Sequence, residues 1–134
     1  MTISELTPQP SDKVAFKLLS FKLVPKLSGC YVLTTFSNEI LYIGLTDSLY
    51  SRFQQHLDNP EKRNPTKIGK AVWFYYLLYD VNNLPKLERT WINQYVSNNG
   101  ELPVLNKINS QLDEDAIETQ EWAGYNMRYI LLPS

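Results

Sequence analysis

Residues 29–44 read GCYVLTTFSNEILYIG, and this stretch decides the fold. Short runs of β-branched and aromatic residues at both of its ends flank the turn-forming residues 36–39. The pattern predicts a β-hairpin. With Tyr31 opposite Gly44, the side chain of Tyr42 points to the same face as that of Tyr31, because side chains alternate along each strand. A register slip of one residue would separate the two tyrosines.

A helix is expected directly after the hairpin. Thr46 and Asp47 can supply the N-cap of a helix that runs from Ser48 to about Asp58. Ser48, Arg52 and His56 share one stripe of this helix, near the edge of the core yet able to reach solvent. The free N–H groups at the start of the helix favour an anion such as phosphate. Four residues at i+4 spacing are expected to form its buried stripe: Leu45, Leu49, Phe53 and Leu57.

A carboxylate interrupts the apolar face of a later predicted helix, residues 84–97. The apolar positions of that face are Leu84, Leu87, Trp91, Ile92 and Tyr95. Glu88 occupies the remaining position. Because a buried carboxylate is costly unless a positive group pairs with it, a metal ion or an arginine is expected beside Glu88. The ordinary structural alternative is a partly buried salt bridge to Arg52 or Arg89.

Together these features resemble the signature of the GIY-YIG nuclease superfamily. The resemblance covers about residues 24–106 and leaves 107–134 as a C-terminal extension of a single domain, 1–134. It implies a mixed α/β fold, in which a small, mixed central β-sheet of about three strands is flanked by helices. The matching residues are Gly29, Tyr31, Tyr42, Gly44, Arg52, His56, Glu88 and, more weakly, Asn106 after Pro103.

The resemblance also implies a mechanism, the hydrolysis of DNA phosphodiester bonds to 5′-phosphate and 3′-hydroxyl ends. Tyr31 would act as general base or pass the proton through its neighbours, and nearby positive charge must lower its pKa of ~10 for the first role. Arg52 would hold phosphate oxygens, and Glu88 would bind one Mg²⁺ or Mn²⁺. Tyr42 would orient the water or Tyr31. His56 would bond to a phosphate oxygen or to Tyr31. Gly29, Gly44 and Asn106 are expected to support this site.

Such an endonuclease is expected to act in DNA repair, recombination or mobile-element processing. Its specificity would come from the branched or nicked shape of DNA, from a protein partner or from a homodimer. One alternative is a non-catalytic nucleic-acid-binding or scaffold protein that retains the fold, which would bind DNA without cutting it. Another is a metal-dependent hydrolase of small phosphate esters, which would cut a model diester and leave DNA intact.

Each site residue also has an ordinary structural interpretation. Tyr31 and Tyr42 could be common strand aromatics, and Arg52 a surface cation over the core. His56 could cap a helix or lie at the surface, and it lacks the partners of a zinc site. Asn106 could simply satisfy a turn. Two other residues depart from the family pattern, since Cys30 replaces an isoleucine or valine and Leu45 stands where many relatives have a polar residue.

The charge is unevenly distributed along the chain. The formal net charge is −1, but nine of the 13 basic residues precede residue 71, whereas eight of the 14 acidic residues follow residue 70. The acidic run 113–121 is expected to be a solvated helix face, or else to screen the DNA or contact a basic partner. Four basic residues that follow the first helix are candidates for a DNA-binding rim: Lys62, Arg63, Lys67 and Lys70.

The remaining expectations concern context and the other segments. No apolar run is long enough to span a membrane, and the single cysteine agrees with a reducing, cytoplasmic location.

Residues 1–12 are expected to be loose, and 13–23 to form a short helix or an additional strand. Residues 59–69 read as a loop, and 71–79 as a central strand buried on both faces. The later helix is expected to be bounded by Asn82 or Asn83, Pro85 and Gly100. The aromatic residues after 120 are expected to pack in a core or subunit contact, or else to stack on nucleic-acid bases.

Overall fold

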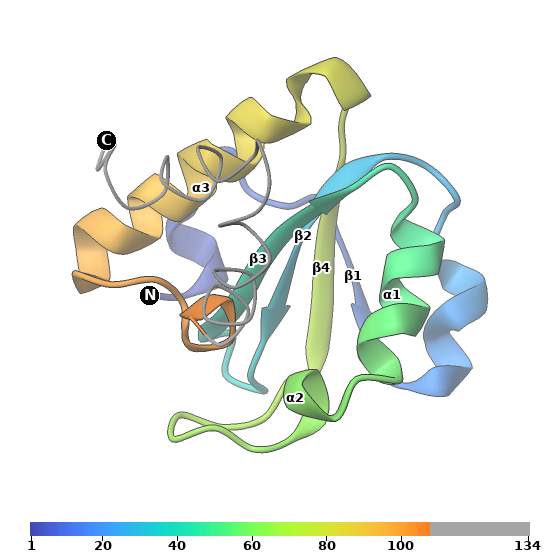
Figure 1. Cartoon of the computed structure of the whole chain (residues 1–134), viewed down its shortest axis with the longest axis horizontal. Coiled ribbons are helices and arrows are strands. Elements are labelled where there is room, and N and C mark those ends of the chain that lie inside the picture. Colours follow the sequence, from blue (N-terminus) through green and yellow to red (C-terminus); the bar gives the residue numbers. More distant parts are fainter. Residues whose placement is uncertain (108–134) are drawn as a thin grey trace, which may run out of the picture.

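The computed structural model describes residues 1–107, which form a four-stranded antiparallel sheet covered by helices on both faces (Figure 1). The strand order is β1-β4-β2-β3. The strands are β1 Asp12–Ala15, β2 Gly29–Thr34, β3 Ile40–Thr46 and β4 Trp73–Leu78. The helices are η1 Ile3–Glu5, η2 Leu18–Leu23, α1 Leu49–Leu57, α2 Pro60–Arg63, η3 Val81–Asn83 and α3 Leu84–Asn99. The acidic run and the late aromatic residues lie outside the described residues.

The predicted fold class is confirmed, but the sheet differs from the expected one in two ways. It has four strands within residues 1–107, because β1 pairs with β4. Since η2 follows β1, residues 13–23 contain both the strand and the short helix that were expected as alternatives. Every pair of neighbouring strands is antiparallel, so the sheet is not mixed. β4 lies inside the sheet as predicted, but only Phe74 and Tyr76 on one face are buried.

Side-chain alternation in β2 divides the core into two layers. Tyr31 and Leu33 pack with α1, whereas Cys30 and Val32 pack with α3 on the opposite face. Figure 1 shows the two helices on opposite sides of the sheet. The hydrophobic effect of both layers therefore fixes β2 at the centre of the domain.

The hairpin has the predicted register, with Tyr31 opposite Gly44 and Leu33 opposite Tyr42. Its turn contains Asn38 with φ 70°, a left-handed conformation that asparagine tolerates well. β3 continues to Thr46, two residues further than expected. The helix therefore begins later.

The N-cap of α1 is Ser48, not Thr46 or Asp47, and its side chain accepts a hydrogen bond from the backbone N–H of Ser51. Leu45 lies in β3 and packs with the α3 layer, so it does not belong to the buried stripe of α1. The other three members of that stripe, Leu49, Phe53 and Leu57, are buried as predicted.

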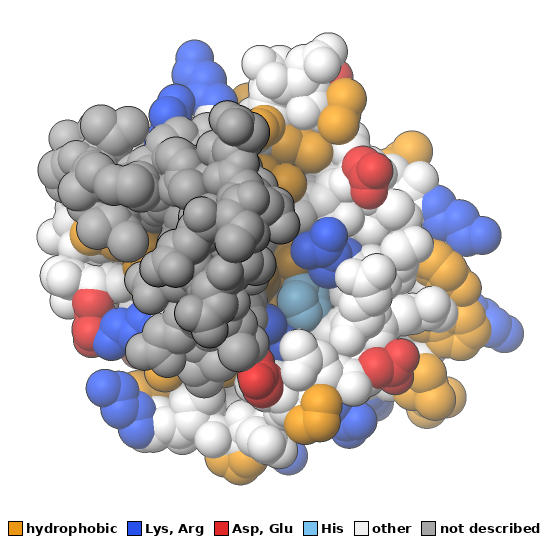
Figure 2. All heavy atoms as spheres, viewed as in Figure 1, with side chains coloured by type: hydrophobic (Ala, Val, Ile, Leu, Met, Phe, Trp, Pro, Cys, Tyr) orange, Lys and Arg blue, Asp and Glu red, His pale blue; other side chains and the backbone are white. Residues whose placement is uncertain are grey.

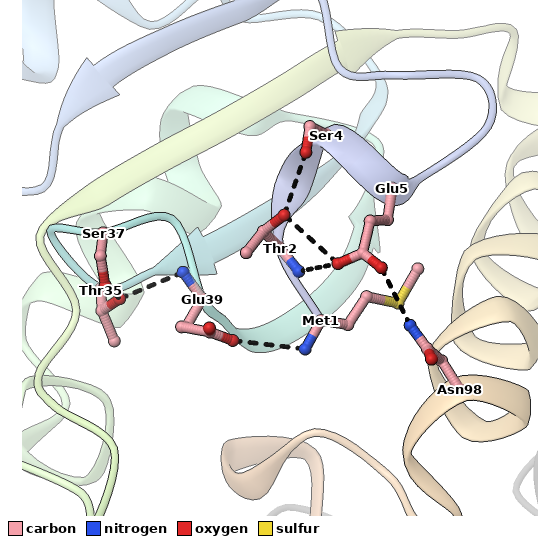
Figure 3. A network of polar contacts seen from close by, with 8 residues as sticks. All are labelled: Met1, Thr2, Ser4, Glu5, Thr35, Ser37, Glu39 and Asn98. Carbon is pink, nitrogen blue, oxygen red and sulfur yellow. Dashed lines mark hydrogen bonds and ion pairs between the residues drawn. The ribbon is translucent and has the colours of Figure 1, made fainter.

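The expectation of a loose N-terminus is wrong. Leu6 is 1% exposed and packs in the α3 layer. The backbone of residues 1–3 pairs with residues 38–40 at the start of β3, and Glu5 accepts hydrogen bonds from the Thr2 N–H and from Asn98 (Figure 3). The segment therefore covers part of an edge strand that would otherwise expose unpaired backbone groups.

The other helix boundaries follow the sequence closely. Asn83 precedes α3, Pro85 lies in its first turn, and Gly100 ends it with φ 80°. Residues 59–69 are not entirely loop, because α2 begins after Asn59, whose side chain accepts the N–H of Glu61. Among residues 1–107, none of the helices has both the length and the apolarity that crossing a membrane requires.

Candidate active site

Tyr31 lies at the centre of the site and is completely buried. Its ring stacks on Phe74, with centroids 5.1 Å apart and an interplanar angle of 10°. Its hydroxyl lies against the backbone of Gly44 on the neighbouring strand, where a Cβ atom would come within 2.5 Å of the Tyr31 oxygen. Gly44 is therefore the residue that leaves room for the Tyr31 phenol.

Gly29 also permits a close approach, in this case between strands. A Cβ atom on Gly29 would lie 2.5 Å from the carbonyl oxygen of Leu77 in β4. The two glycines of the hairpin thus have different roles, since Gly29 fits β2 against β4 and Gly44 accommodates a side chain.

His56 lies on α1 and is hydrogen-bonded to Tyr31, with 2.6 Å between Nε2 and the phenolic oxygen. It is 6% exposed, so a surface role for this histidine is wrong. Burial, together with the positive charges of Lys62 and Arg52, lowers the pKa of His56 to about 3. The imidazole is therefore neutral near pH 7, and its Nδ1–H tautomer can accept the Tyr31 proton at Nε2.

The phenol of Tyr31 is held in its protonated form. Burial raises its pKa well above the ordinary value, Tyr42 and Glu88 add to this effect, and Arg52 opposes it. Arg52 alone does not bring the pKa of Tyr31 below its ordinary value, because burial penalises the phenolate by more than one half-buried guanidinium stabilises it. Tyr31 in this environment is a proton donor.

Tyr42 and Lys62 form the next part of the site. The Tyr42 ring centroid is 5.9 Å from that of Tyr31 and 5.2 Å from that of His56. Lys62 Nζ lies 4.7 Å from the Tyr42 ring centroid, and the Lys62 side chain is only 2% exposed. The structure thus places Lys62 at the site and not on an exposed basic rim. The signal that could have revealed this is Asn59-Pro60, a capping residue followed by proline at the first helical position.

The other three residues of the predicted basic rim are exposed. Arg63 lies at the end of α2, where its Nη1 donates to the carbonyl oxygen of Leu57, and Lys67 and Lys70 follow in the loop. The structure does not bring these three side chains into the Tyr31 site. Their contact with DNA stays a prediction.

Glu88 lies on α3 and is 6% exposed, as its position in the apolar face predicted. Its negative charge raises the pKa of both Tyr31 and Cys30, so it acts electrostatically on side chains that point to opposite faces of β2. The carboxylate therefore belongs to the electrostatic environment of the site.

Asn106 supports the hairpin from outside the sheet. Its Oδ1 accepts the backbone N–H of Ile43 at 2.8 Å, and its Nδ2 donates to the Ile43 carbonyl at 2.9 Å. Ile43 lies between Tyr42 and Gly44. Asn106 thus fixes the backbone of the edge strand where that strand contacts Tyr31.

The site reaches the surface at Tyr42 and Arg52, which are both partly exposed. Figure 2 shows a histidine side chain at the surface of this face, with Lys or Arg side chains beside it. A site of this kind combines a buried hydrogen-bonded pair with positive charge that favours an anionic ligand.

Comparison with known proteins gives two findings. A family model described as the GIY-YIG catalytic domain matches residues 27–101. UvrABC system protein C of Mycoplasmoides gallisepticum is 36% identical over 61 residues, which are 46% of this chain and 10% of that protein. The chain thus spans about a tenth of the length of this curated relative.

Proposed function

The chain belongs to the GIY-YIG catalytic-domain family, and on this basis we propose that it is a metal-dependent DNA endonuclease that leaves 5′-phosphate and 3′-hydroxyl ends. The observation that carries the proposal is the 2.6 Å hydrogen bond between the buried Tyr31 phenol and neutral His56. A phenol whose proton already has an acceptor can take a proton from water as it releases its own.

The proposed proton path runs from the attacking water to the Tyr31 oxygen and from Tyr31 to Nε2 of His56. A relay avoids a free phenolate, which burial disfavours. His56 is a weak acceptor in the free protein because burial and two cations lower its pKa. A bound phosphodiester would bring negative charge to those cations and so raise the pKa of His56, which makes it a better acceptor only when substrate is present.

Arg52 is the residue proposed to bind the phosphate. It lies on α1 one turn before His56 and is half-buried, and burial alone would lower its pKa, but Tyr31, Tyr42 and Asp47 keep the pKa above its usual value. It therefore remains a cation. A guanidinium can hold two phosphate oxygens at once as negative charge develops on them.

The donor set fits a single Mg²⁺ or Mn²⁺ ion at Glu88. No three His, Cys, Asp or Glu side chains within residues 1–107 gather into a metal-binding group, so a closed protein cage is absent from that part of the chain. Mg²⁺ is commonly held by one or two carboxylates together with water and substrate phosphate, which suits one buried carboxylate beside a phosphate site. When bound, the ion would neutralise charge on the leaving 3′ oxygen.

DNA repair is the proposed biological role, supported by the similarity to a UvrABC system protein. Because the match spans a small part of that protein, the proposal concerns the cutting step alone. Specificity would come from DNA shape, a protein partner or a homodimer.

The proposal is tested with labelled linear, nicked, flapped and branched DNA, incubated with Mg²⁺, with Mn²⁺ or with a chelator. We expect the wild type to cut at least one substrate only when metal is present, and Glu88→Gln to lose this activity while retaining its fold. Glu61→Gln, which changes an exposed glutamate of α2, is the matched control. DNA binding without cleavage on every substrate would favour the non-catalytic alternative.

A further inference from the structure

Lys62 is buried where a lysine is rarely found. It lies in α2 between the exposed residues Glu61 and Arg63, yet its own side chain is 2% exposed. The helix is anchored by the Asn59 cap and packs against α1. Lysine is almost never fully buried without an interaction that offsets the loss of hydration. Its orientation toward the site is therefore built into the fold.

A short series of contacts links Lys62 to the proton-transfer pair. Its ammonium group lies over the Tyr42 ring at 4.7 Å, and the Tyr42 and His56 rings are 5.2 Å apart. His56 in turn is bonded to the Tyr31 hydroxyl. We infer that Lys62 is a positioning residue of the proposed cleavage reaction, which acts through Tyr42 and His56 and not as an anchor for the DNA backbone. This inference rests on the proposed function.

Two physical effects support the role. A cation over the face of a tyrosine ring is attracted by the ring quadrupole, which holds the half-buried Tyr42 beside His56. The charge of Lys62 also follows burial as the second cause of the lowered pKa of His56. Within residues 1–107, the charged or titratable groups that face His56 are Tyr31 from β2, Tyr42 from β3, Arg52 from α1 and Lys62 from α2. Lys62 thus helps to keep His56 neutral, in the form that accepts a proton from Tyr31.

A phosphate anchor would behave differently. Loss of a lysine that contacts only the DNA backbone weakens binding on every sequence and reduces the salt dependence of binding by about one counterion. Loss of a positioning lysine leaves binding and its salt dependence nearly unchanged and slows the chemical step. Loss of a phosphate anchor therefore raises KM, whereas loss of a positioning residue lowers kcat.

The first test does not require cleavage. His56 is the only histidine of the sequence, so its ring signals in an NMR pH titration are unambiguous. We expect Lys62→Met to raise the pH at which His56 becomes protonated, Lys62→Arg to leave it near the wild-type value, and Lys17→Met, which removes an exposed lysine, to have no effect. Equal titration midpoints in wild type and Lys62→Met would overturn the inference.

The second test measures cleavage by the same variants between pH 5 and pH 9. In Lys62→Met the cation that holds Tyr42 beside His56 is lost, so we expect kcat to fall roughly tenfold, a part of the ~10²–10⁴-fold that positioned acid–base groups contribute. KM should stay constant, the acidic limb of the profile should move to higher pH, and Lys62→Arg should restore most of the rate. A raised KM with unchanged kcat would instead assign Lys62 to DNA binding. If the wild type cuts no DNA, the proposed function fails, whereas the NMR titration still decides whether Lys62 controls His56.

Discussion

The contact between Gly44 and Tyr31 makes Gly44→Ala a demanding test of the site. A Cβ atom at residue 44 would lie 2.5 Å from the Tyr31 oxygen, 2.6 Å from its Cζ and 2.9 Å from Cε2 of Tyr42. An ordinary contact begins at 3.4 Å, so the Tyr31 hydroxyl would have to move by about 0.9 Å. Phe74 stacks on the Tyr31 ring and restricts that movement.

The magnitude follows from two opposing effects. Overpacking of a buried site costs about 1–3 kcal/mol, whereas replacing glycine by alanine stabilises the protein by about 0.4–1 kcal/mol through the unfolded chain. We therefore expect a net loss of about 1–2 kcal/mol in the free energy of unfolding, which is a fall of roughly 3–8 °C in Tm for a domain of this size. Because a movement of this size would disturb the 2.6 Å hydrogen bond to His56, kcat should fall by up to about 100-fold, as is typical of a 1 Å misplacement.

The assays are a thermal melt and a single-turnover DNA cleavage measurement at a temperature where the variant is folded. Gly100→Ala is the matched control, since a Cβ atom on Gly100 would have no neighbour within 4 Å, although the φ of this residue is 80°. It should cost about 1–2 kcal/mol through left-handed strain and leave kcat unchanged. If Gly44→Ala melts and cuts like the wild type, the close approach of Tyr31 to β3 is refuted.

Three further predictions concern the surroundings of the site. Asn106→Ala removes two hydrogen bonds to the Ile43 backbone, so we expect a loss of about 1–3 kcal/mol and faster hydrogen exchange at the Ile43 amide; unchanged exchange would contradict the buttressing role. Because the pKa of His56 is lowered from 6.5 to about 3, its contribution to stability is present above pH 6.5 and is lost as the pH falls toward 3. Between pH 7 and pH 5 the free energy of unfolding, measured with urea, should fall by about 2 kcal/mol more in the wild type than in His56→Gln. Equal losses would show that His56 is not buried as a neutral group. Leu6→Ala should lower the free energy of unfolding, measured with urea, by about 2–5 kcal/mol. Almost no change would show that the N-terminus is not packed against the domain.

The hairpin and the position of Glu88 could be predicted from sequence because both depend on short-range periodicity. The period of two fixes which residues share a face with Tyr31, and the spacing of a helix places Glu88 among buried apolar residues. The register of Tyr31 against Gly44 followed from the place of the turn, residues 36–39, between the two strands. These are local properties, so one chain was enough to find them.

What the sequence did not predict depends on contacts between distant segments. Leu6 is buried because it packs with residues of α3 and β3, and nothing in the local composition of residues 1–12 indicates this. The direction of the Lys62 side chain depends on how α2 packs against α1. The effect of burial on the pKa of Tyr31 was not predicted either, because the complete burial of the phenol could be seen only in the folded chain.

The central claim is that the Tyr31 hydroxyl transfers a proton in DNA cleavage. Its most direct test is single-turnover cleavage by wild type, Tyr31→Phe and Tyr79→Phe, with DNA binding and thermal stability measured in parallel. Tyr79 is 39% exposed and serves as the matched control. We expect Tyr31→Phe to remain folded, to bind DNA and to lose about 10²–10⁴-fold in rate, while Tyr79→Phe cuts like the wild type. Cleavage by Tyr31→Phe at the wild-type rate would contradict the claim.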